Sequence, residues 1–239
     1  LRVIGSGDAF GTGGRGQTCF WLKWDDSNIL IDCGATAMSG IKKMGLQIEN
    51  LEFMLISHLH GDHIGGIPFL LTELAYVHKS ESKIKIVGPE GISKTISELQ
   101  ELLYPGSLKW VEGIVEFEEY KDSFVLNSFL VKNKSVNHSE LSQPNGIRIE
   151  KNDKVFAYSG DSDWTDAILE LSDKADLFIC ECYNYESETP GHMNYMTLKN
   201  KFDMMNFRNI YLTHPGPEMI DRSHSIPVPM LKDGEIINF

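Results

Sequence analysis

The segment SHLHGDHIGG, residues 57–66, places three histidines and an aspartate at the end of the apolar run LEFMLIS, residues 51–57. A continuous apolar run of this length favours a strand buried on both faces. Neutral imidazoles and carboxylates are the usual protein ligands of zinc-like ions. The chain must therefore fold so that a buried strand ends at a polar site. We expect that site to bind metal.

Other polar candidates also lie at the ends of expected strands. His138 ends the segment SVNH, Asp161 follows KVFAYSG, and His214 ends RNIYLTH. In open α/β sheets the loops at the carboxyl ends of several strands converge, so these residues are expected to meet the first cluster. The expected ligands fall into three groups: His58, His60 and His138 for one ion, Asp62, His63 and His214 for a second, and Asp161 as the bridge between them.

Two neighbouring ions would hold a shared water and lower its pKa, so that hydroxide is present at neutral pH. This chemistry is typical of a hydrolase. Two divalent ions are the expected cofactors, with zinc favoured and manganese or iron as alternatives, because imidazole and carboxylate ligands suit all three.

The remaining pattern indicates a layered α/β protein with a single domain over residues 1–239. Strands are expected over 1–7, 51–57, 84–89, 175–183 and 208–214, a hairpin over 18–33 with its turn at Asp25–Asn28, and short strands within 111–160. Helices are expected over 35–45, 67–80, 91–105, 163–173 and 194–206.

Composition limits the classes of partner and the cellular compartment that we expect for this protein. The net charge is −12 and the chain has no cluster of Lys and Arg, so a large nucleic acid is disfavoured as a substrate. No apolar run of about 20 residues is present, and the first residues resemble a strand and turn rather than a secretory signal. A cytoplasmic protein is therefore expected. The four cysteines include no CxxC pair, which favours buried free thiols over a disulfide or redox role.

In its motifs the chain resembles the metallo-β-lactamase superfamily. The resemblance rests on five segments: ILIDCG (29–34), SHLHGDHIGG (57–66), VNHS (136–139), YSGDS (158–162) and LTHPG (213–216). It implies an α/β fold, a four-layer αββα sandwich with the metals in a cleft at one edge of the two sheets. Within the superfamily the chain is similar to the ribonuclease Z and phosphodiesterase branch, through GSGDAFGTGGRGQTCF (5–20) and through NGIRIE after His138.

Membership of that branch would give three residues a catalytic role. His192 matches a histidine placed near the leaving group, where it would act as the acid, and Glu181 matches the carboxylate that supports it. Asp62 would also orient the hydroxide. The alternatives are a turn histidine beside Pro190–Gly191 and, for Glu181, an ordinary hydrogen-bond acceptor at a strand end.

One departure from the branch concerns the substrate. Ribonuclease Z enzymes carry a tRNA-holding arm between the third and fourth motifs, whereas His138 to Asp161 leaves room only for a hairpin here. We therefore expect a phosphodiesterase acting on a small phosphodiester or on a nucleotide or RNA end. The alternatives are an acyl hydrolase for thioesters or lactones, and a metal-binding scaffold without turnover. A homodimer could complete a substrate groove.

The glycine-rich turn between Gly5 and Gly16 has two interpretations. Its backbone amides could cradle a phosphate, or its glycines could serve only a turn that needs positive φ. The sequence leaves open whether this turn and His224 line the site.

Overall fold

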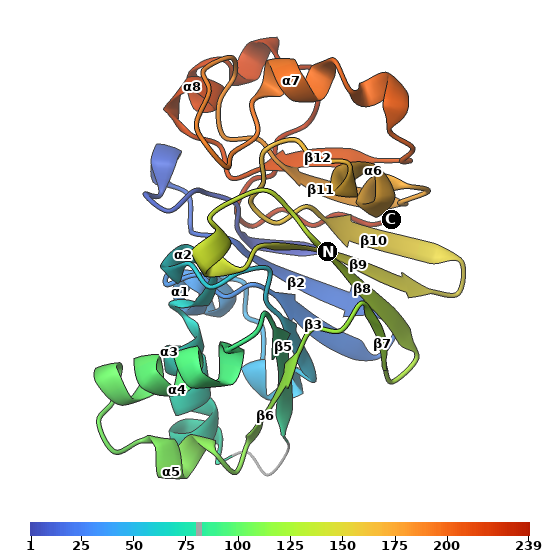
Figure 1. Ribbon diagram of the computed structural model, residues 1–239. Helices are drawn as coiled ribbons and strands as arrows, with labels where there is room; N and C mark the ends of the chain where they lie inside the picture. Colours follow the sequence, from blue (N-terminus) through green and yellow to red (C-terminus); the bar gives the residue numbers. More distant parts are fainter. Residues whose placement is uncertain (80–82) are drawn as a thin grey trace. The chain divides into compact units, whose positions relative to one another are not determined.

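The structure, a computed structural model, describes residues 1–79 and 83–239 and divides into two compact units (Figure 1). Unit 1 comprises residues 1–5, 16–119 and 232–238, and unit 2 comprises residues 6–15, 120–231 and 239. Each unit contains one six-stranded sheet together with helices. The expected α/β class is confirmed, whereas the single domain stays a prediction.

The sheet of unit 1 has its strands in chain order, antiparallel from β1 to β3 and parallel from β3 to β6. The strands are β1 (Arg2–Gly5), β2 (Cys19–Trp24), β3 (Ser27–Ile31), β4 (Phe53–Leu55), β5 (Ile84–Gly88) and β6 (Val115–Glu119). The helices are α1 (Ala37–Lys43), α2 (Gly61–Ile64), α3 (Ile67–Glu73), α4 (Ile92–Leu103) and α5 (Leu108–Val111). Alternate strand residues such as Leu30, Met54 and Ile86 pack with the helices in one core.

The sheet of unit 2 has the order β12-β11-β10-β9-β8-β7, antiparallel from β7 to β10 and parallel from β10 to β12. Its strands are β7 (Ser123–Leu126), β8 (Phe129–Ser135), β9 (Asn145–Lys151), β10 (Lys154–Tyr158), β11 (Leu177–Glu181) and β12 (Ile210–Thr213). Its helices are α6 (Ala167–Ser172), α7 (Tyr195–Lys199) and α8 (Pro217–Asp221). Phe178, Leu212 and Leu171 belong to its core.

The structure confirms most expected elements and corrects several boundaries. The hairpin of β2 and β3 forms, but its turn is limited to Asp25 and Asp26 because Asp25 takes the left-handed conformation with φ 53°. The helix expected over 67–80 is α3, followed by a π-helical turn at Leu74–His78, and its last residue, 80, lies outside the described residues. The helix expected over 194–206 is interrupted after α7, and a 3₁₀ turn follows at Phe202–Met204.

Three short helices, α2, α5 and α8, have no counterpart among the sequence-based expectations. Each spans only four or five residues, too few for a helical periodicity to be visible in the sequence. Over residues 1–79 and 83–239, no helix has the length and apolarity that crossing a membrane would require.

Candidate metal centre

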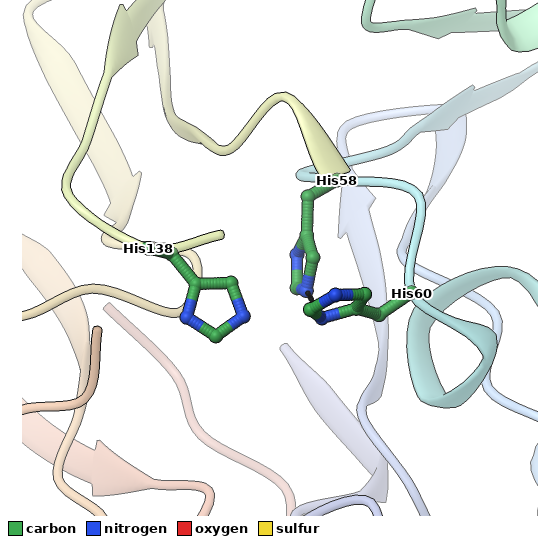
Figure 2. A group of neighbouring side chains, drawn as sticks. All are labelled: His58, His60 and His138. Carbon is green, nitrogen blue, oxygen red and sulfur yellow. Dashed lines mark hydrogen bonds between the residues drawn. The ribbon is translucent and has the colours of Figure 1, made fainter. Parts of the chain in front are cut away.

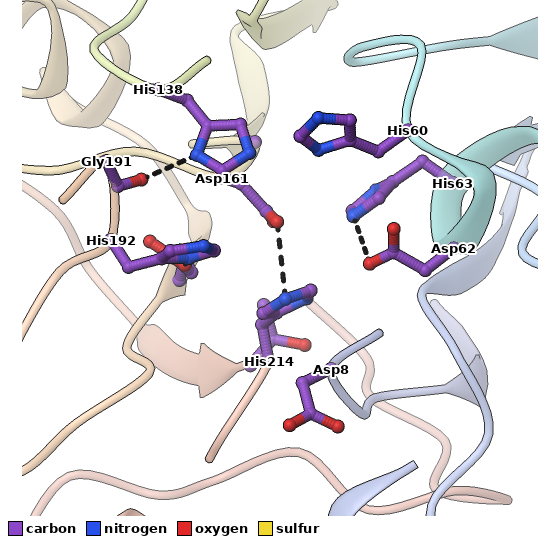
Figure 3. A network of polar contacts seen from close by, with 12 residues as sticks. Asp8, His60, Asp62, His63, His138, Asp161, Gly191, His192 and His214 are labelled. Carbon is purple, nitrogen blue, oxygen red and sulfur yellow. Dashed lines mark hydrogen bonds and ion pairs between the residues drawn. The ribbon is translucent and has the colours of Figure 1, made fainter. Parts of the chain in front are cut away.

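The first histidine cluster lies at the carboxyl end of β4 in unit 1. His58 and His60 lie on the segment between β4 and α2, while Asp62 and His63 lie on α2 itself. Nε2 of His58 is 3.1 Å from Nδ1 of His60 (Figure 2). Nε2 of His63 is 3.2 Å from a carboxylate oxygen of Asp62 (Figure 3). The cluster therefore presents two neighbouring pairs of possible ligand atoms.

Asp32 orients this cluster through its contacts with His63 and Ser57, a role that the sequence did not reveal. Its Oδ2 lies 2.7 Å from Nδ1 of His63, and its two oxygens accept the Ser57 N–H and O–H at 2.7 Å each. Ser57 Oγ in turn lies 3.0 Å from Nδ1 of His58. These contacts favour the tautomers in which Nε2 is the ligand atom of both histidines. The available signal was the position of Asp32 directly after β3, the parallel neighbour of β4.

The glycines of the motif allow the backbone to pass close to the turn after β3. Cys33 N–H donates to the His63 carbonyl at 2.7 Å, and Gly66 N–H donates to the Cys33 carbonyl at 2.8 Å. A Cβ on Gly66 would lie 2.3 Å from the carbonyl oxygen of Gly34, so a side chain is excluded there. The close approach holds α2 against the turn that carries Asp32.

The second cluster lies at the carboxyl ends of the parallel strands β10, β11 and β12 in unit 2. Asp161 follows β10, Glu181 ends β11 and His214 follows β12. Nε2 of His214 is 3.2 Å from Oδ2 of Asp161, and both side chains are buried (Figure 3). His192 completes a group of four residues whose ligand atoms lie within 4.8 Å of one another. The expected convergence of strand ends is therefore present in this unit.

His138 follows β8 in the same unit and is oriented by the backbone of a distant loop. Its Nδ1 donates to the Gly191 carbonyl at 2.7 Å (Figure 3), so Nε2 is the ligand atom in this tautomer. The rings of His138 and His192 meet edge to face, with centroids 4.7 Å apart.

The buried Glu181 carboxylate pairs with the partly exposed imidazole of His192. Oε1 of Glu181 contacts Nδ1 of His192, while Oε2 accepts the N–H groups of Ser162 and Met193 at 3.0 Å each. Burial raises the pKa of Glu181, the hydrogen bond from His192 opposes this, and the Asp161 charge raises it further. Both Glu181 oxygens thus have hydrogen-bond donors.

Tyr183 is a further residue beside this pair that the sequence did not indicate. Its ring centroid lies 5.0 Å from that of His192 and 6.3 Å from that of His214. Burial raises the pKa of the Tyr183 phenol, and the charges of Asp8 and Glu181 add to the effect. The phenol is therefore protonated at neutral pH.

Asp8 organises the glycine-rich turn. Its buried carboxylate accepts the N–H of Thr12 at 2.8 Å and the Thr12 hydroxyl at 2.6 Å. Gly11, Gly13 and Gly14 all have positive φ, which confirms that the turn needs glycine for its conformation. Binding of a phosphate by this turn stays a prediction. His224 is exposed on a 3₁₀ turn of unit 2, and its place at the site also stays a prediction.

The donor chemistry of both clusters fits divalent metal. The ligand atoms are imidazole nitrogens and carboxylate oxygens, and His63 and His138 have their Nδ1 atoms held by other groups. Such support behind the ligands is typical of metal sites, and the mixed donor set suits zinc, manganese or iron.

Similar proteins of known structure define the fold class. The metallo-β-lactamase fold protein YhfI from Bacillus subtilis has a TM-score of 0.81 at 22% identity, covering 99% of this chain and 98% of its own. The short form of human tRNase Z has a TM-score of 0.81 at 21% identity, again covering 99% and 98%. A diphosphatase of the PhnP family has a TM-score of 0.78 at 16% identity, covering 100% and 96%. The expected metallo-β-lactamase fold is confirmed.

Comparison of sequences gives the family. A ribonuclease Z from Agathobacter rectalis is 25% identical over 89% of this chain and 86% of its own length, which confirms the resemblance to ribonuclease Z. The family model of the anti-Pycsar protein Apyc1 matches residues 1–231, and the chain belongs to that family.

Proposed function

We propose that the chain is a metal-dependent phosphodiesterase whose two clusters together hold two divalent ions. His58, His60 and His138 would bind one ion, Asp62, His63 and His214 the other, and Asp161 would bridge them. The donor chemistry of each cluster and the contacts behind His63 and His138 support this assignment.

When bound, the ions supply an activated hydroxide and polarise the phosphate. Asp62 would also orient this hydroxide. His192 donates a proton to the departing oxygen, and Glu181 holds the imidazole by its Nδ1 so that Nε2 delivers that proton. Tyr183 packs against the His192 ring and limits its rotation.

The observation that carries the proposal is the Glu181–His192 pair beside Asp161 and His214. A phosphodiester expels an alkoxide, whose departure needs a proton, whereas a thioester expels a thiolate that is stable without one. An oriented histidine at this place therefore favours phosphodiesters over thioesters. The similarity to a ribonuclease Z and to a diphosphatase of the PhnP family supports the same choice.

A small phosphodiester or a nucleotide or RNA end is the proposed substrate. Between His138 and Asp161 the chain forms a 3₁₀ turn at Glu140–Ser142 and the β9–β10 hairpin, which turns at Asn152 and Asp153. The net charge of −12 also disfavours a long polyanion. A homodimer and a cytoplasmic location stay predictions.

The substrate class can be tested on metal-stripped protein reloaded with zinc or manganese. Hydrolysis is measured for bis-p-nitrophenyl phosphate, cyclic nucleotides and short RNA, beside a thioester and a lactone. The proposal expects metal-dependent turnover of phosphodiesters only. Cleavage of the thioester or lactone alone would assign the chain to the acyl hydrolases, and stable metal binding without any turnover would indicate a scaffold.

A further inference from the structure

Glu218 binds three consecutive backbone amides of another segment in unit 2. Its Oε2 accepts the N–H groups of Tyr185 at 3.1 Å, Glu186 at 3.3 Å and Ser187 at 3.1 Å. Successive amides that point at one anion form a nest, a backbone anion site. Burial alone would raise the pKa of Glu218, but the hydrogen bonds from this segment outweigh it and lower the pKa.

The segment held by Glu218 begins the loop that joins β11 to α7. The base of the loop is closed by the Tyr195 N–H, which donates to the Asn184 carbonyl at 2.8 Å. Inside the loop, the Asn184 amide donates to the Thr189 hydroxyl at 2.8 Å, and the His192 N–H donates to the Thr189 carbonyl at 3.0 Å. A continuous series of hydrogen bonds therefore runs from the base of the loop to His192.

The second half of this loop contacts one histidine of the candidate metal centre, His138, and contains another, His192. Its Gly191 carbonyl accepts from Nδ1 of His138, and its next residue, His192, pairs with Glu181. Space at Gly191 is narrow, since a Cβ there would lie 2.9 Å from Nδ1 of His138. A displacement of the loop would therefore move His192 and disturb the orientation of His138 together.

Tyr185, the first residue of the bound segment, is also held by stacking on Tyr195, with ring centroids 5.6 Å apart. Glu186, Ser187 and Glu188 are exposed. Glu218 holds this exposed segment through its backbone amides. An acidic residue is chemically suited to this place because only an anion binds three amides strongly.

We propose that Glu218 is a positioning residue that fixes the conformation of the loop of residues 184–194. Through this loop, Glu218 also fixes the positions of the His192 and His138 side chains. Its effect on catalysis rests on the proposed function, whereas its effect on the loop does not. Glu218 neither supplies a ligand nor transfers a proton.

The test compares Glu218→Ala with Glu188→Ala, a matched control that removes an exposed carboxylate from the loop itself. Amide hydrogen exchange is followed in the metal-free proteins at His192, whose N–H is bonded to Thr189 and not to Glu218. In Glu218→Ala this amide is expected to exchange at least about tenfold faster, and in Glu188→Ala at the wild-type rate. Unchanged exchange at His192 would overturn the proposal.

A second readout compares the turnover of two substrates with different leaving groups by the zinc-loaded proteins. A cyclic nucleotide expels an alkoxide, and kcat on this substrate should fall about tenfold in Glu218→Ala. On bis-p-nitrophenyl phosphate kcat should fall less than about threefold, because the p-nitrophenolate leaving group needs little protonation. Glu218→Gln, which keeps one acceptor oxygen, should recover part of the loss. Equal losses on both substrates would show a merely structural role and overturn the proposal. If the wild type hydrolyses no phosphodiester, the proposed function fails, and exchange at His192 alone decides the role of Glu218.

Discussion

Oδ2 of Asp32 lies 2.7 Å from Nδ1 of His63, and both side chains are fully buried. The same carboxylate binds the amide and hydroxyl of Ser57, so one group orients the imidazole and fixes the end of β4. A carboxylate behind a histidine ligand fixes its tautomer and raises its basicity.

Replacing Asp32 with Asn should therefore weaken metal binding without unfolding the protein. Asn tolerates the left-handed conformation of this position, where φ is 55°. Because the charge is lost, we expect zinc affinity to fall about 10- to 100-fold, measured by competition with a chelator. Asp26→Asn, in the exposed hairpin turn, is the matched control. Equal affinity in both variants would show that Asp32 has no part in metal binding.

The His192→Ala variant separates the proposed acid from the proposed metal ligands. Metal content should stay at the wild-type level, while kcat on a cyclic nucleotide falls about 10²- to 10⁴-fold because the alkoxide leaves unprotonated. The loss on bis-p-nitrophenyl phosphate should be much smaller. His78→Ala, which removes a histidine paired with Glu73, controls for loss of an imidazole. A folded His192→Ala protein that had lost metal would instead make His192 a ligand.

Gly191→Ala tests the contact between the loop and His138. The backbone there has φ 77°, and an added Cβ would approach Nδ1 of His138 to 2.9 Å. We expect a loss of about 1 kcal/mol or more in the free energy of unfolding, together with weaker metal binding. Thermal unfolding and chelator competition measure the two effects. Gly45→Ala, at another positive φ but with nothing near its Cβ, should lose stability only.

The four cysteines should be unreactive in the folded protein. Cys19, Cys33, Cys180 and Cys182 are free and buried, and burial raises the pKa of each thiol above its usual range. Ellman's reagent at about pH 8 should therefore label none of them before denaturant is added, and all of them afterwards. Rapid labelling of one native thiol would contradict the burial described here and reopen a redox role.

The positions of most strands along the chain and of the polar residues at their ends could be predicted because both follow from local patterns. A buried strand needs a continuous apolar run, and the residue after it is placed at the edge of the sheet. Asp161, Glu181 and His214 were found in this way, and the structure brings them together with His192 in one unit.

The contacts behind the ligands could not be predicted in the same way because they join distant parts of the chain. Asp32 and His63 are 31 positions apart, and Gly191 and His138 are 53 positions apart. Glu218 binds its loop from a short helix that gives no periodic signal. Tertiary packing, which no local pattern specifies, determines which carboxylate or carbonyl supports which histidine.

A zinc titration of the metal-stripped protein, followed by turnover of bis-p-nitrophenyl phosphate, tests the dinuclear phosphodiesterase most directly. We expect turnover to rise to a plateau at about two equivalents of zinc per chain, and Asp161→Ala, which lacks the proposed bridging carboxylate, not to reach that plateau. Turnover that saturates at about one equivalent, or that stays at background while zinc is bound, would contradict this expectation.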